Sequence, residues 1–139
     1  MTTTPTLTYA LDPTTFEVLT DAIEHYAAHQ ELLTHDRQFT PTAEDRMALL
    51  VEVLDADRLR RTIEAAEDSG QVTITLDPST YRVLTEALAT YQADQTHAAA
   101  EATAEHDDPE AGDPAHQAAA TADRLHLQAI EATQLTPHD

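Results

Sequence analysis

The chain has 139 residues, and its 26 acidic residues against seven arginines and no lysine give a formal net charge of −19. Cysteine is absent, which excludes disulfides, thiolate zinc sites and catalysis by a thiol. Only two glycines and two serines occur, which argues against a phosphate-cradling glycine loop or a nucleophile elbow. We therefore expect a protein that is not an enzyme and uses no cofactor.

The acidic excess is spread over both halves of the chain. Such a charge repels itself in dilute buffer, but it keeps a protein soluble where molar salt screens charges within a few ångströms. The composition therefore predicts a protein of a halophile cytoplasm. A second interpretation stays open, in which the acidic surface imitates a phosphate backbone and the protein is a nucleic-acid mimic.

No membrane partner is expected from the sequence. The longest strictly apolar run, Met47 to Val51, is far too short to cross a bilayer. The N-terminal residues carry no basic segment of the kind that begins a signal peptide. A cytoplasmic location follows as the expectation.

Two segments of the chain are nearly the same. LDPTTFEVLTDAIEHYAAHQ at 11–30 and LDPSTYRVLTEALATYQADQ at 76–95 match in register, with mostly conservative differences. This similarity predicts two internal repeats, 6–70 and 71–135, within a single domain of residues 1–139. The repeats are expected to share one core, because each alone has too much surface for its volume.

Each repeat opens with a segment in which apolar and polar residues alternate, at 6–11 and 71–76, and this period of two predicts a half-buried strand. The Asp-Pro pair after each strand predicts an N-cap and a first helical residue. Because a lone strand leaves its backbone groups unpaired, the two strands are predicted to form an antiparallel ribbon across a pseudo-twofold axis.

Two helices follow each strand in the prediction. The first has apolar residues three and four apart, interrupted by Gln30 and Gln95, as on the seam of a helical hairpin. These glutamines either set the register of the seam or lie near a solvated end. The second helix of the first repeat starts at a Thr42 cap and carries a stripe of apolar residues at Met47, Leu50, Val51 and Leu54. Its apolar phase then shifts to Leu59, Ile63 and Ala66, which predicts a kink or a fresh start at Asp55. Residues 105–116 are predicted to form a flexible acidic loop. The predicted fold class is α+β and mostly helical, a tandem strand-helix-helix repeat.

The stretch VTITLDPSTYRVLTEAL, residues 72–88, resembles the opening of ribbon-helix-helix DNA-binding proteins. The resemblance implies paired strands in the major groove, with these residues facing the bases: Thr6, Thr8, Ala10, Thr73 and Thr75. Two features differ from that family, since the first helix is longer and neither strand carries the basic residues that neutralise phosphates. A DNA-binding regulator is therefore the alternative function. It requires an exposed threonine face with arginines beside it, drawn from Arg37, Arg46, Arg58 and Arg61.

Three arginines, Arg58, Arg60 and Arg61, form the basic cluster of the chain and are candidates for an interaction surface. Two of them are also spaced for ion pairs within one helix, with Asp57 four residues before Arg61 and Glu64 four residues after Arg60. A solvated ion-pair face is the simpler interpretation of this cluster.

His25 and His29 lie one helical turn apart, at a spacing that allows two imidazoles to share a metal ion. No HExxH pattern accompanies them, and the second repeat has Thr90 and Asp94 at the equivalent positions. We therefore expect no metal site, with these two histidines as weak candidates.

The function expected from the sequence is that of a non-catalytic protein-interaction or regulatory module. Its partner is expected to be another protein, with DNA as the alternative. The repeats are compatible with a monomer that acts as a pseudo-dimer, or with a homodimer.

Overall fold

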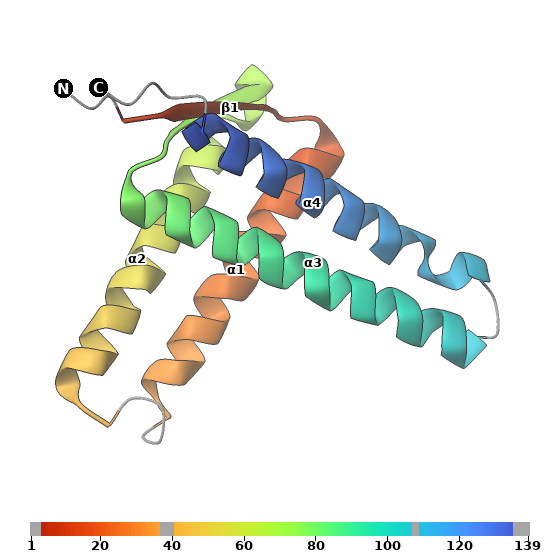
Figure 1. Ribbon diagram of the computed structural model, residues 1–139, viewed down its shortest axis with the longest axis horizontal. Helices are drawn as coiled ribbons and strands as arrows, with labels where there is room; N and C mark the ends of the chain where they lie inside the picture. The colour runs from red at the N-terminus through yellow and green to blue at the C-terminus, as the bar shows by residue number, and fades with distance from the viewer. Residues whose placement is uncertain (1–3, 37–40, 107–108, 135–139) are drawn as a thin grey trace.

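The computed structural model describes residues 4–36, 41–106 and 109–134, which form two strands, four α-helices and two short 3-10 helices (Figure 1). Their bounds in chain order are β1 Thr6–Ala10, α1 Pro13–Thr34, α2 Ala43–Ala65, η1 Glu67–Ser69, β2 Gln71–Thr75, α3 Pro78–His106, η2 Pro109–Gly112 and α4 Asp113–Gln134. The protein is mostly helical with one two-stranded antiparallel ribbon, which confirms the prediction at this level.

The ribbon pairs β1 with β2 so that Thr8 lies opposite Thr73 and Thr6 opposite Thr75. Its inner face is buried and its outer face is exposed along both strands. Leu11 N donates to Gly70 O at 2.7 Å, and Leu76 N donates to Pro5 O at 2.8 Å, so one further backbone bond extends each end of the ribbon. The alternating sequence therefore gives a half-buried ribbon, as predicted.

Both first helices begin as the Asp-Pro pairs predict. The Asp12 carboxylate accepts from Thr15 N at 2.8 Å, and the Asp77 carboxylate accepts from Thr80 N at 2.8 Å. Each bond satisfies a donor at a helix start that lacks a helical partner. The same hydrogen bonds hold the pKa of both carboxyl groups below the ordinary value.

The four helices form two hairpins, α1 with α2 and α3 with α4, which diverge from the ribbon (Figure 1). The second helix of each hairpin also contacts the strand of the other half of the chain: α2 packs on β2, and α4 packs on β1. Tyr9 links β1 to α4, where its hydroxyl donates to Leu125 O at 2.6 Å.

The core lies where the two first helices cross under the ribbon. Its largest side chains with almost no exposed surface include Tyr9, Leu19, Ile23, Ile63, Leu84, Leu88 and Leu125. These side chains come from β1 and from all four α-helices, so both halves of the chain contribute to one core. Among the described residues, none of the helices is both long and apolar enough to cross a lipid bilayer.

Two details differ from the sequence-based prediction. The second helix has no break at Asp55 and continues from Ala43 to Ala65, because its two apolar phases lie on two faces of one helix. The predicted loop at 105–116 is shorter, since α3 continues to His106 and α4 begins at Asp113. Between them, η2 packs so closely on α3 that a Cβ on Gly112 would lie 2.6 Å from Ala99 O.

Gly70 ends the first half of the chain with φ +78°, in the left-handed region that favours glycine. This conformation reverses the chain between η1 and β2.

Candidate functional site

The outer face of the ribbon carries small uncharged side chains. Thr73 and Thr75 are exposed there, with Thr6, Thr8, Ala10 and Gln71 beside them. The hydroxyls of Thr8 and Thr73 are hydrogen-bonded to each other at 2.9 Å across the strands. The face is open to a partner but offers no positive charge to a phosphate.

Arg58, Arg60 and Arg61 lie together near the end of α2, and their side chains differ in surroundings. Arg60 is half-buried and contacts Asp57 at 2.8 Å, Glu24 of α1 at 3.6 Å and Glu64 at 3.8 Å. Arg61 pairs with Asp57 at 3.0 Å and is largely exposed. Both predicted four-residue ion pairs are therefore present. Arg58 is exposed, and within the described residues its guanidinium forms no ion pair.

Of the arginines named for a DNA-binding face, Arg46 lies apart from Arg58 and Arg61, which share the end of α2. Arg46 lies at the start of α2, where it borders a surface hollow with Thr34 and His35. Arg58 is twelve residues further along the helix, a rise of roughly 18 Å. Arg37 lies outside the described residues.

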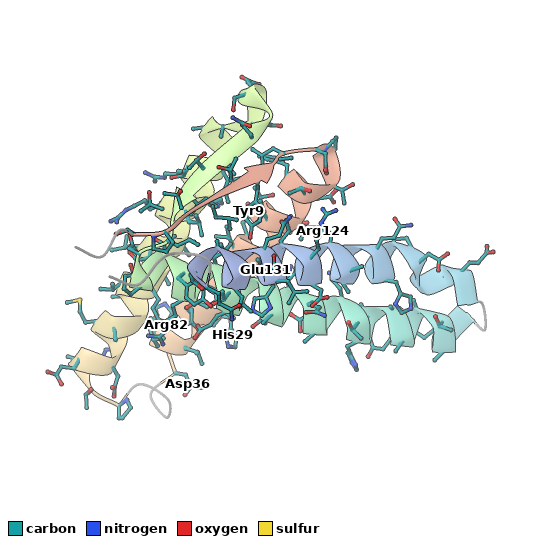
Figure 2. All side chains as sticks on the ribbon, turned by 45° about the horizontal axis from the view of Figure 1, so that its top comes forward. Tyr9, His29, Asp36, Arg82, Arg124 and Glu131 are labelled. Atoms are coloured by element: carbon teal, nitrogen blue, oxygen red, sulfur yellow. The ribbon has the colours of Figure 1, made fainter. Side chains whose placement is uncertain are left out.

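His25 and His29 are both exposed on α1. The His25 ring lies 6.3 Å from the ring of Tyr91 on α3, in a tilted arrangement. His29 is labelled in Figure 2. In the part of the chain that the structure describes, no three His, Asp or Glu side chains are grouped so that they could hold a metal ion.

A polar cluster joins α1, α2 and α3 at the edge of the core. The Tyr26 hydroxyl donates to Glu86 at 3.1 Å and lies 3.4 Å from Glu52, and the Gln30 amide donates to Glu52. Arg82, which is labelled in Figure 2, reaches across from α3 to Glu52 at 2.9 Å and also lies 3.4 Å from Glu86. The buried Gln30 is therefore a polar residue at the hairpin contact rather than at a solvated end.

The cluster contains two carboxylates, Glu52 and Glu86, and one guanidinium, Arg82, which contacts both. Burial raises the pKa of the Tyr26 hydroxyl, and the charges of Glu52 and Glu86 raise it further. The same two carboxylates raise the pKa of Arg82. Each charged group has its partner inside the cluster, which gives the cluster a structural role at the meeting point of three helices.

The most unusual surface lies on the first half of α2. Met47, Leu50, Val51 and Leu54 are all exposed, with exposed fractions from 44% for Leu50 to 64% for Leu54. Their spacing of three, four and seven places them on one side of the helix, which we call the α2 apolar face. The buried residues of α2 are Ala56, Leu59 and Ile63, which lie on the opposite side.

A groove of ≈ 340 Å³ runs beside the α2 apolar face, between α1 and α2. Ala27 and Ala28 of α1 line it together with Val53 and Leu54, and Arg60 lies at its border. Leu54 therefore belongs both to the groove and to the apolar face.

Sequence reasoning identified these apolar residues but missed their exposure. The signal was present in the change of apolar phase after Leu54. On a helix with 3.6 residues per turn, such a change moves the apolar side of the helix away from the core.

Comparisons of this chain with protein-family models, with curated proteins and with solved structures found no match. Its function therefore has to be inferred from its own surfaces.

Proposed function

We propose that the protein is a non-catalytic protein-interaction module and that the α2 apolar face is its binding surface. The observation that carries this proposal is the distribution of exposed large apolar side chains. Among the described residues, six large apolar side chains are exposed, and five of them lie on the hairpin of α1 and α2: Leu32, Met47, Leu50, Val51 and Leu54. Scattered apolar residues are ordinary on a protein surface, but a contiguous group at helical spacing is typical of a binding site.

The rest of the surface supports an interaction through this face. A chain with a net charge of −19 exposes carboxylates over much of its area, and the apolar face is a local exception. Apolar burial does not depend on opposite charges, so it remains effective in molar salt, where exposed ion pairs are screened. The proposal therefore includes a halophile cytoplasm as the setting.

We also propose that the two halves form a fused pseudo-dimer. The ribbon register supports it, because Thr8 and Thr73 are equivalent positions of the two repeats and lie opposite each other. The two backbone hydrogen bonds that extend the ends of the ribbon support it as well. When the first repeat is aligned with the second, the bond from Leu11 N to Gly70 O corresponds to the bond from Leu76 N to Pro5 O.

The interaction is tested by changing one side chain of the face. The tagged full chain would be expressed in a halophilic host and purified in molar KCl, and the mass of its complex would be measured by light scattering. We expect a mass above the monomer for the wild type and the monomer mass for Leu54→Glu. Leu127→Glu is the matched control, because Leu127 is 50% exposed on α4, away from the face, and it should behave as the wild type. A complex of unchanged mass in Leu54→Glu would contradict the proposal.

A ribbon-helix-helix-like DNA regulator is the second candidate, favoured by one observation. The threonine-bearing face of the ribbon is exposed along both strands. A titration with a pool of DNA duplexes in molar KCl tests it, with Thr73→Val and Thr75→Val as variants that remove hydroxyls from the face. Binding that these variants weaken would support the regulator, and no binding by the wild type would exclude it.

A further inference from the structure

The α2 apolar face has opposite charges at its two ends. Glu44 lies one turn before Met47, and Arg58 lies one turn after Leu54, each spaced so that it continues the same side of the helix. Both side chains are exposed. Along this side, α2 therefore carries an acid, four apolar residues and then Asp57, Arg58 and Arg61. Asp57 and Arg61 pair with each other at 3.0 Å, which leaves Arg58 as the base without an ion pair at this end.

This order makes the face complementary to itself when two copies are antiparallel. We propose that the occupant of the α2 apolar face is a second copy of this chain, bound through an antiparallel pair of α2 helices. The inference rests on the proposed function and names its partner. Contacts between two copies related by a twofold axis are reciprocal, so a surface that complements itself is what such a dimer needs.

The proposed register follows from the positions of the apolar residues. With the twofold axis between Leu50 and Val51, Met47 lies opposite Leu54 of the partner subunit, and Leu50 lies opposite Val51 of the partner subunit. Glu44 then lies opposite Asp57 of the partner subunit, a carboxylate that is already paired with arginines of its own chain, and one residue away from Arg58 of the partner subunit. The Arg58 guanidinium has no ion pair among the described residues of its own chain, so it can serve this contact.

The apolar face by itself supplies about two-thirds of the area that a stable dimer needs. The four apolar side chains expose on the order of 400 Å² per copy, so pairing them buries roughly 800 Å², against about 1,200 Å² or more for a stable interface. We assign the remainder to flanking contacts of Glu44 and Arg58 of both copies and to the groove beside Leu54.

Salt has a predictable effect on this association. Two copies with a net charge of −19 each repel one another in dilute buffer, and molar KCl removes most of that repulsion. We therefore expect the dimer to become tighter as KCl rises, although the Glu44 to Arg58 contacts are themselves weakened.

The first test uses the purified chain alone, with no other protein present. Light scattering in molar KCl should give twice the mass of the 15.2 kDa chain for the wild type and for Leu127→Glu. Leu54→Glu should give the monomer mass with an unchanged far-UV circular dichroism spectrum, because Leu54 contributes to the surface and not to the core.

The second test fixes the direction of the pair and benefits from a chain without cysteine. Met47→Cys and Leu54→Cys would be prepared separately, unfolded together, refolded in molar KCl and oxidised. A disulfide needs Cα atoms within about 7 Å. In the antiparallel pair the mixture should cross-link between the two variants, whereas Met47→Cys alone should not, because its two cysteines are roughly 10 Å apart along the helices.

The outcomes separate this inference from the proposed function. A wild type that stays monomeric alone in molar KCl at about 100 µM, well above a typical dissociation constant in the micromolar range, overturns the second copy as occupant. If the complex from the halophilic host still depends on Leu54, the proposed function stands with a different partner. Cross-linking of Met47→Cys alone as efficient as that of the mixture overturns the antiparallel arrangement.

Discussion

Replacement of Tyr9 by Phe measures how strongly the ribbon is attached to α4. The Tyr9 side chain is 2% exposed, and its hydroxyl donates to Leu125 O at 2.6 Å. Phenylalanine keeps the ring in the core and removes only the hydrogen bond. Leu125 O lies inside α4 and keeps its helical donor four residues later, so no acceptor is left wholly unpaired. We therefore expect a loss of about 1 kcal/mol, in the middle of the range for a single hydrogen bond.

Urea unfolding in molar KCl, followed by far-UV circular dichroism, measures this loss. A change of about 1 kcal/mol moves the urea midpoint by about half a molar for a chain of this size, and lowers the Tm by about 4 °C. Tyr81→Phe is the matched control, because Tyr81 is half-buried and its hydroxyl forms no hydrogen bond within the described residues. Equal midpoints for Tyr9→Phe and Tyr81→Phe would refute the assignment of this free energy to the Tyr9 hydrogen bond.

Three further predictions concern the core and the polar cluster. Ile63→Ala should lower the free energy of unfolding by about 3 kcal/mol, because Ile63 has no exposed surface, and a urea titration that shows less than about 1 kcal/mol would contradict the described packing. Arg82→Met leaves Glu52 without its cation and should lower the free energy of unfolding by about 1 kcal/mol, a small value because Arg82 is largely exposed. Combining Arg82→Met with Glu52→Gln should recover most of this loss in the same urea titration. Burial raises the pKa of Tyr26 above its unfolded value of about 10, so the stability that the neutral phenol contributes is complete below that pH and is lost as pH rises through the folded-state pKa. Urea midpoints between pH 8 and pH 11 should therefore fall less steeply for Tyr26→Phe than for the wild type, and identical slopes would count against the burial of this hydroxyl.

Much of the fold followed from local patterns in the sequence. The alternating residues of 6–11 and 71–76 predicted the strands, and Asp12 and Asp77 predicted the helix starts, because these signals act over one or two turns of chain. The polar cluster was not predictable in this way. Glu52 meets Tyr26 and Arg82 only after three helices have packed, and no spacing within the sequence encodes that meeting.

The candidate site was half predictable. The residues of the α2 apolar face were recognised as a helical stripe, and the arginines after it were recognised as a cluster. Whether a stripe faces the core or the solvent depends on which side of the helix its neighbours cover. In α2 that choice is made by Leu59 and Ile63, which dock against the rest of the core and leave Leu54 outside.

The ribbon cannot form during synthesis until β2 has been made. Thr8 and Thr73 meet at its centre although 65 residues separate them. At typical rates of translation, β1 leaves the ribosome roughly 3 to 13 s before β2 leaves it. During that interval it is an unpaired edge, open to β2 of a neighbouring chain that is further advanced. Exchange of strands between nascent copies is thus an assembly error that this topology permits.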